Sequence, residues 1–273
     1  MRLAWIFAAA LASLALSCES QTGDRHSEHG IPPPSGTGKS IRELRDPAVP
    51  GQAEQVGKSH DVTGVIVLAV DAYNETQDNA VGTIYVQDVA GGAYSGLTLF
   101  APTFNPANLR VGPGDVLDMR AQYQELQRIP SATPVVFAPG SFIPQLVFPT
   151  ATFRYETRVP EPTDIDVNDL ADYATGGKWI GMLVRVKNVT LFEDALRANE
   201  RGGRLAIDLL PPPPNPQNGC DLPFPKVPEL SNELFDLAEM KLTQGTTLKS
   251  VVGVVSFFCT LKIAPRSAAD IER

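Results

Sequence analysis

The 273-residue chain predicts a mostly β fold: two small antiparallel β-barrels in tandem, the second with a short helix, preceded by a disordered tether. Three observations favour this fold. The chain holds 24 Pro and 22 Gly, as expected for many short strands joined by turns. Apolar and β-branched residues recur in short runs separated by polar or Gly-rich segments. The same order of runs occurs twice, over 58–158 and over 178–273, with a linker at 159–177.

The N-terminus has the pattern of an export signal. Arg2 precedes an uncharged apolar run, Leu3–Leu16, which is too short for a typical membrane-spanning helix. The sequence Ala15-Leu16-Ser17-Cys18 resembles the bacterial lipobox. This resemblance implies a lipoprotein signal peptide at 1–17, a lipidated Cys18 as the mature N-terminus, and anchoring to the cell envelope, with the outer membrane favoured. The alternative is a conventional cleavage site that leaves Cys18 free or removes it.

Residues 18–57 are predicted to form a flexible tether from the lipidated Cys18. They are rich in Ser, Gly, Pro and Gln, and their apolar residues are too sparse to form a core. A flexible segment of about 40 residues has an r.m.s. span of roughly 35 Å, which would hold a folded body clear of the lipid.

The first barrel is predicted from five strands. Alternation is clearest in the fourth, where Leu117, Met119 and Ala121 share one face and the charged residues share the other. Five strands in this order suit a small antiparallel barrel. The predicted strands are Asp61–Tyr73, Gly82–Asp88, Gly96–Phe100, Val116–Tyr123 and Pro144–Pro149.

The second barrel repeats this arrangement with one helix added. Ser231 is placed to cap a helix over Ser231–Leu242, on which Leu234, Leu237 and Ala238 share a face. The predicted strands are Trp179–Val186, Gly203–Leu209, Thr247–Phe258 and Leu261–Ser267.

The strand order and the final Pro-containing strand resemble the OB-fold. The segments Gly82–Asp88, Gly114–Val116 and Pro265–Ile271 are similar to OB-type domains of secreted bacterial lipoproteins, and similar domains accompany some extracellular nucleases. The resemblance implies a ligand surface across the second and third strands and the loops beside them.

Candidate ligand-binding residues follow from that surface. They are Thr83, Tyr85, Gln87, Tyr94, Phe100 and Arg120 in the first unit, and Lys178 and Arg185 in the second. Tyr85 and Phe100 could equally cover the barrel or the contact between units. The cations could equally be solvated residues of strand faces.

The cysteines predict one disulfide. With Cys18 assigned to lipid, Cys220 and Cys259 remain as a pair in an oxidising compartment. The alternative is two separate buried thiols.

Catalytic and metal chemistry has little support. The three histidines, His26, His29 and His60, lie in the predicted tether or at its end, so the barrels would hold no histidine base. The carboxylates of Asp164, Asp166, Asp169 and Asp172 fall in the predicted linker and are interpreted as solvated. A calcium site at Asp71 and Asp78 is a weak possibility, because the run lacks the Gly and Glu of an EF-hand. No cofactor is predicted.

The leading functional hypothesis is a non-catalytic envelope lipoprotein that binds a protein or glycan partner as a binding or scaffold module. The first alternative is an accessory protein that binds single-stranded nucleic acid, which the net charge of -8 and pI near 5.0 disfavour. The second alternative is a calcium- or carboxylate-dependent enzyme.

Overall fold

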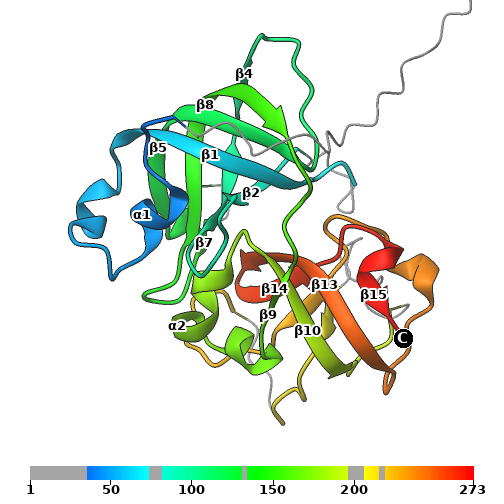
Figure 1. Ribbon diagram of the computed structural model, residues 1–273. Coiled ribbons are helices and arrows are strands. Elements are labelled where there is room, and N and C mark those ends of the chain that lie inside the picture. Colours follow the sequence, from blue (N-terminus) through cyan, green and yellow to red (C-terminus); the bar gives the residue numbers. More distant parts are fainter. Residues whose placement is uncertain (1–35, 74–81, 131–133, 196–205, 215–218) are drawn as a thin grey trace, which may run out of the picture.

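The computed structural model describes residues 36–73, 82–130, 134–195, 206–214 and 219–273, and these are mostly β (Figure 1). They form an N-terminal unit, up to residue 158, and a C-terminal unit, from residue 159, each built on one sheet. The predictions for the signal peptide, Cys18, His26, His29 and Asp78 lie outside the described residues.

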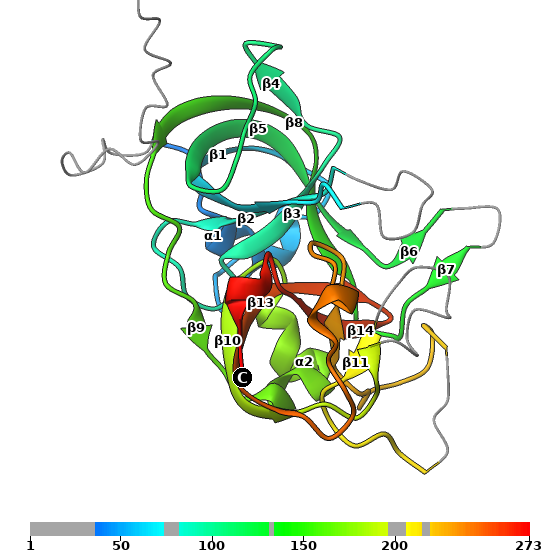
Figure 2. The same cartoon turned by 90° about the vertical axis from the view of Figure 1, so that its right-hand side faces the viewer.

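The first sheet contains every strand predicted for the N-terminal unit. Its order is β3-β2-β1-β5-β8-β4, and β3 also pairs in parallel with β8. Figure 2 shows β1, β5 and β8 curving strongly. The bounds are β1 (Ser59–Val70), β2 (Ile84–Asp88), β3 (Gly96–Phe100), β4 (Thr103–Asn105), β5 (Asp115–Leu126) and β8 (Ile143–Glu156). The strands β5 and β8 are longer than predicted.

Between β5 and β8 the chain makes an excursion that we call the arm, residues 127–130 and 134–142. Its two short strands, β6 (Arg128–Ile129) and β7 (Val135–Val136), pair only with each other. The arm leaves the first sheet and packs against the C-terminal unit.

The second sheet has the order β11-β12-β14-β13-β10-β9, and β15 pairs with β13. Its β12 and β14 are parallel, as are β3 and β8 in the first sheet. The described strands are β9 (Thr163–Asp164), β10 (Leu183–Thr190), β11 (Ala206–Asp208), β12 (Glu229–Ser231), β13 (Thr247–Phe258), β14 (Thr260–Ala264) and β15 (Ile271–Glu272). The 3₁₀ turn η6 (Ala268–Asp270) precedes β15.

The predicted helix over Ser231–Leu242 is wrong. Ser231 ends β12, and only a 3₁₀ turn, η5 (Ala238–Met240), lies further along. Local hydrogen bonds account for this: Ser231 Oγ accepts from Glu233 N at 3.2 Å, and Asp236 Oδ1 accepts from Ala238 N at 2.9 Å. Such short-range bonds offer the backbone an alternative to a helical ladder.

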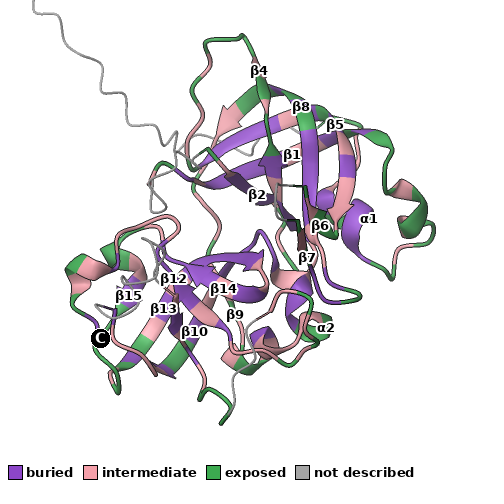
Figure 3. Ribbon diagram, turned by 180° about the vertical axis from the view of Figure 1, so that it is seen from behind, coloured by how far each residue is buried: buried purple, intermediate pink, exposed green. Residues whose placement is uncertain are grey.

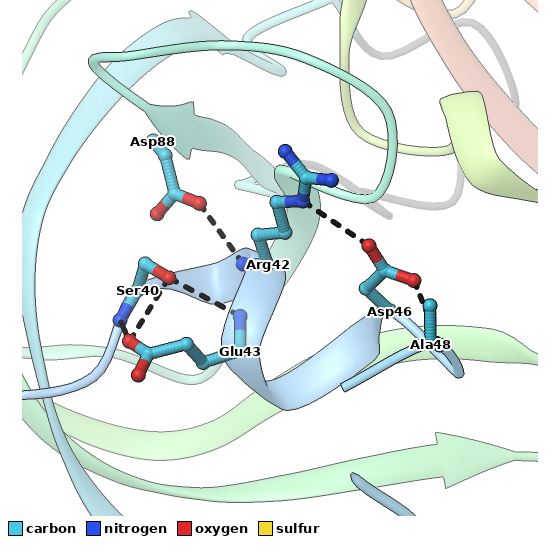
Figure 4. A network of polar contacts seen from close by, with 6 residues as sticks. All are labelled: Ser40, Arg42, Glu43, Asp46, Ala48 and Asp88. Atoms are coloured by element: carbon cyan, nitrogen blue, oxygen red, sulfur yellow. Dashed lines mark hydrogen bonds and ion pairs between the residues drawn. The ribbon is translucent and has the colours of Figure 1, made fainter. Parts of the chain in front are cut away.

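The tether prediction is wrong for residues 36–57, which are folded onto the N-terminal unit. They contain α1 (Ile41–Arg45) and η1 (Gln52–Gln55), and Lys39 bridges to Val62 of β1. The cause is a capping box in which Ser40 Oγ accepts from Glu43 N at 3.1 Å and Ser40 N donates to Glu43 Oε2 at 2.7 Å (Figure 4). Ile41 and Leu44 are fully buried in the first core.

The linker at 159–177 is also structured. It holds β9, η2 (Val167–Ala171) and α2 (Tyr173–Gly176), and η3 (Gly177–Trp179) follows. Asp166 and Asp172 cap η2 and α2 with their side chains. Because Leu170 is fully buried in the second core, this segment belongs to the C-terminal unit.

Buried side chains form three apolar clusters, and the strands of both units carry long buried stretches in Figure 3. One cluster fills each unit. The third lies between the units and holds Ile66, Leu68, Ala69, Tyr85 and Val116 of the first with Leu183 and Val254 of the second.

Candidate functional site

The face predicted to bind a ligand is turned toward the C-terminal unit. Tyr85 and Gln87 of β2 are 2% and 3% exposed. Gln87 Oε1 accepts a hydrogen bond from Leu183 N at 3.3 Å, and the Tyr85 ring lies in the apolar cluster between the units. The prediction that these two side chains face solvent is therefore wrong. For Tyr85, the alternative of a contact between units is correct.

Backbone meets backbone at one point of this interface. A Cβ atom on Gly96 would come within 2.6 Å of Met182 N, and one on Gly181 would come within 2.6 Å of Leu97 Cα. Gly181 also has φ of +81°, a region that favours glycine. β3 and the turn before β10 therefore approach as closely as two main chains can.

Arg45 of α1 ties both units together at the same point. Its guanidinium donates to the carbonyls of Ile180 and Gly177, each at 2.8 Å, and to that of Gly96. Burial lowers the pKa of Arg45 from its usual value. The N-terminal segment that was predicted to be a tether thus supplies the charged group at the centre of the interface.

The arm makes a third connection. Phe137 is buried in the core of the C-terminal unit, where its ring centroid lies 5.0 Å from that of Phe257. Tyr173 of α2 donates its hydroxyl proton to the Phe142 carbonyl at 2.6 Å. The arm therefore contributes apolar surface to the core of the unit that follows it in the chain.

A cavity of about 230 Å³ remains between the units, and we call it the cleft. β2, β3 and β8 line one side, and β11 to β14 line the other. The residues of the N-terminal unit are Thr83, Tyr85, Thr98, Leu99, Phe100, Ile143 and Gln145; those of the C-terminal unit are Ile180, Ala206, Ser231, Glu233, Ser256, Phe257, Phe258 and Lys262.

A tyrosine–carboxylate contact crosses the cleft. The Tyr85 hydroxyl donates to Glu233 Oε1, which joins β2 to the segment after β12. Burial raises the pKa of Tyr85 well above its ordinary value, and the Glu233 charge raises it further. The phenol therefore stays protonated near neutral pH and acts as a hydrogen-bond donor to the carboxylate.

Two further polar features complete the wall. Lys262 of β14 pairs with Glu229 of β12. Ser256 Oγ, on β13 beside the Tyr85 hydroxyl, is buried and has no partner at hydrogen-bond geometry among the described residues. Buried hydroxyls are normally satisfied, so Ser256 marks a place where a ligand atom could be bound.

Aromatic side chains lie where the cleft meets solvent. Phe100 lines the cleft yet is 53% exposed. Its ring meets that of Phe148 edge to face, with centroids 5.7 Å apart. Phe148 is 69% exposed and has φ of +48°, which is rare for a bulky residue. It lies where the register of β8 shifts against β5, so the bulge turns this ring outward.

The other predicted site residues lie apart from the cleft. Tyr94 contributes backbone, its N–H donating to the Lys178 carbonyl at 2.8 Å. Lys178 Nζ lies 5.0 Å from the centroid of the Trp179 ring. Arg185 Nη1 lies 3.3 Å from Asp164 Oδ1, and Asp164 also pairs with Lys187 Nζ at 2.5 Å. Lys178 and Arg185, the cations predicted as candidates to bind a nucleic-acid backbone, are therefore engaged in contacts within the C-terminal unit.

Arg120 lies at a second hollow, of about 480 Å³, over β1, β5 and β8. Its Nη1 pairs with Asp61 Oδ1 at 3.0 Å, and both side chains are exposed. This hollow is larger but is lined by one sheet only, with no aromatic side chain. We therefore place the candidate site in the cleft, where both units converge and a buried hydroxyl lacks a partner among the described residues.

Asp71, His60 and the two described cysteines lie outside the cleft. Asp71 is buried at the end of β1, and no group of three metal-binding side chains occurs among the described residues. His60 belongs to β1, so the prediction that the folded units hold no histidine is wrong; its Nε2 lies 3.1 Å from the Gln55 carbonyl. The Cys220–Cys259 disulfide is confirmed, with Cα atoms 4.2 Å apart. No helix in the described ranges has the length and apolar character needed to cross a bilayer.

Sequence reasoning missed Glu233, Ser256 and Lys262. Glu233 falls within the helix that was predicted over Ser231–Leu242 and that does not form. Ser256 carried a weak signal, since it interrupts the apolar run Val254–Phe258 of a predicted strand. Nothing in the pattern showed that these residues would face Tyr85.

Searches against protein-family models, characterised proteins and solved structures gave no match to this chain.

Proposed function

We propose that this protein is a non-catalytic binding module of the bacterial cell envelope, that its two sheets are OB-like barrels, and that its ligand site is the cleft between them. The pairings of the first sheet support the barrel assignment. They run from β1 through β2, β3, β8 and β5 and return to β1, as in a five-stranded Greek-key barrel.

The cleft is the single observation that carries the proposal. Protein ligand sites are concave, mostly apolar, and hold a few placed polar groups. Here Phe257 and Ile143 supply apolar wall, while Glu233 and Ser256 supply polar atoms. The volume of about 230 Å³ lies below the roughly 300–1,000 Å³ of pockets for drug-sized ligands, so the ligand is a single ring or a short chain.

The nucleic-acid alternative loses its main support. Stacking on an OB surface needs exposed aromatic rings along the second and third strands. Tyr85 is covered by the C-terminal unit, which leaves Phe100 as the exposed ring on these two strands. Lys178 and Arg185 are engaged within their own unit. A small envelope-derived molecule or the end of a glycan fits the cleft better than an extended strand.

Two matched substitutions test the cleft. Thr98→Trp places a large ring in the cleft, and Thr152→Trp places the same ring in the hollow beside Arg120. The full chain is titrated with monosaccharides, amino acids and short cell-wall peptides by ligand-detected NMR and thermal shift. We expect at least one compound that binds the wild type and Thr152→Trp but not Thr98→Trp. If no compound makes this distinction, the cleft is not the ligand site.

The envelope location has an independent test. In a bacterial host, mass spectrometry of the mature N-terminus should find Cys18 as the first residue, carrying acyl chains. Cys18→Ser should shift the protein from the membrane fraction to the soluble envelope fraction. A mature wild-type N-terminus without acylation contradicts the lipoprotein assignment.

A further inference from the structure

The charges that line the cleft do not balance. Among its described lining residues and their ion-pair partners, Glu229 and Glu233 are acidic and Lys262 is the only base. Lys262 pairs with Glu229, so Glu233 is left with a neutral donor, the Tyr85 hydroxyl, as its side-chain partner. A carboxylate that is partly removed from water is stabilised most by a cation.

The neighbouring groups are those that recognise hydroxyls. Ser256 Oγ is buried beside the Tyr85 hydroxyl, and no described residue meets it at hydrogen-bond geometry. Thr98 and Gln145 hold weak contacts of 3.4 Å to the Pro144 carbonyl and to Gln124 Oε1. A hydroxyl both donates and accepts, so a hydroxylated ligand could satisfy Ser256 in either sense. Each of these side chains lines the cleft together with Glu233.

The wall also offers an apolar face. Phe257 is buried beneath the cleft, and half-exposed Phe100 lies where the cleft reaches solvent. A ring with one apolar face could lie against Phe100 while its polar edge reaches Ser256 and Glu233.

We propose that the cleft binds a single hydroxylated ring bearing a protonated amino group, as in an amino sugar, with the ammonium on Glu233 and a ring hydroxyl on Ser256. This inference rests on the proposed function of the cleft and names its ligand class. The ammonium supplies the cation that the described wall lacks, and the small volume limits the ligand to one ring.

Three sugars that differ in a single substituent isolate the charge. Glucosamine, glucose and N-acetylglucosamine are titrated into the full chain at pH 6, where the free amine is protonated. We expect the Kd of glucosamine to be about tenfold lower than that of glucose, as one charge-assisted hydrogen bond would give. Glu233→Gln should abolish this preference. Ser256→Ala should lower the affinity for glucosamine and for glucose by the same factor.

A third variant separates charge from packing. Tyr85→Phe removes the donor to Glu233 but keeps the ring and the carboxylate, so the preference for glucosamine should persist. Circular dichroism and the Tm of each variant show whether it is folded. If Glu233→Gln is unfolded, the charge is tested on the wild type instead. Its preference for glucosamine over glucose should then be lost at high salt.

The possible outcomes separate the preference for an amine from the proposal that the cleft is a ligand site. Equal affinity for glucose and glucosamine, or tighter binding of the acetylated sugar, overturns the amine inference. If Thr98→Trp abolishes the binding of these sugars, the cleft is still supported as a ligand site. The amine inference is also overturned if Thr98→Trp leaves glucosamine binding unchanged, or if none of the three sugars binds. In either case, the titration with monosaccharides, amino acids and cell-wall peptides decides whether the cleft is a ligand site.

Discussion

Gly96 and Gly181 set the distance at which the two units meet. Both positions exclude a side chain, because a Cβ on either would enter the backbone of the other strand or turn. Interfaces that depend on side chains can adjust by changing rotamers, but one made of two main chains has no such freedom. The geometry of the cleft, which lies beside this contact, therefore depends on these two residues.

Gly181→Ala tests this contact against a matched control. Gly140 has the same φ of +81° but no atom within 4 Å of the position that a Cβ would occupy, so Gly140→Ala measures backbone strain alone. That strain is about 1–2 kcal/mol. We expect Gly181→Ala to lower the free energy of unfolding by about 2 kcal/mol more than Gly140→Ala, because the collision is added. Urea denaturation measures both, and equal losses would contradict a close main-chain contact.

Arg45 is the second residue on which the interface depends. Removing its guanidinium leaves the carbonyls of Gly96, Gly177 and Ile180 buried without this donor. Since an unsatisfied buried group costs about 1–3 kcal/mol, Arg45→Ala should destabilise the fold by at least about 3 kcal/mol.

The control is three residues away. Arg42 is 58% exposed and makes a surface ion pair with Asp46, so Arg42→Ala should cost less than about 1 kcal/mol. A small effect of Arg45→Ala, similar to that of Arg42→Ala in the same denaturation experiment, would show that water or local movement replaces the guanidinium.

At the scale of elements, α1 is attached to the sheet by one carboxylate. Asp88, at the end of β2, accepts from Ile41 N at 2.7 Å and from Arg42 N at 2.9 Å, and Figure 4 shows the second of these bonds. Burial raises the pKa of Asp88 to about 6, although both hydrogen bonds act to lower it. The attachment of the N-terminal segment is therefore sensitive to pH.

The sign of the effect follows from the direction of the shift. The folded protein takes up a proton on Asp88 near pH 6, whereas the unfolded chain does so near its ordinary pKa of about 3.9. The contribution of Asp88 to stability is thus lowest above about pH 6, increases as the pH falls toward about 4, and is constant below that. The total change is roughly 3 kcal/mol.

Asp88→Asn should remove this dependence, because an amide does not titrate. The measurement is the free energy of unfolding from urea curves between pH 7.5 and 4, expressed as wild type minus variant. We expect the difference to shift in favour of the wild type as the pH falls. A difference that stays constant over this range would mean that Asp88 titrates near its ordinary pKa.

The strands could be predicted from the sequence, and two of them, β3 and β13, have the predicted bounds. The alternation of apolar and polar residues, or a continuous apolar run, is a local property, so a short segment of sequence is enough to predict a strand. α1 could also have been found, since Ser40-x-x-Glu43 before Leu44 is a capping box, but the polar composition around it suggested a tether.

Tertiary contacts decided the rest. The segment after Ser231 has helical periodicity, yet Leu230 and Ser231 are held in β12, which pairs with β11 and β14. Tyr85 alternates correctly with Ile84 and Val86, but alternation gives only the face of the strand, not what covers it. The cleft joins residues more than a hundred positions apart, and no local pattern encodes that distance.

At the scale of the whole molecule, we expect the two units to unfold as one cooperative body. The apolar cluster between them, the Arg45 contacts and the arm all cross the boundary. Differential scanning calorimetry should therefore give a single endotherm whose calorimetric and van't Hoff enthalpies agree. Two resolved endotherms would contradict this coupling.

Phe137→Ala tests the arm within that body. Truncating this buried ring should cost about 3–5 kcal/mol and lower the Tm of the single transition. Val136→Ala, at the neighbouring half-exposed position, should change stability by less than about 0.5 kcal/mol. If Phe137→Ala instead leaves the Tm unchanged, the arm contributes no stability to the C-terminal unit.

The arm also has a consequence for the order of assembly. Ribosomes make the chain from the N-terminus, so Phe137 emerges well before β10, β13 and β14, the strands around it. We expect this ring to stay exposed until those strands are made, and to become buried only when the last sheet forms around it.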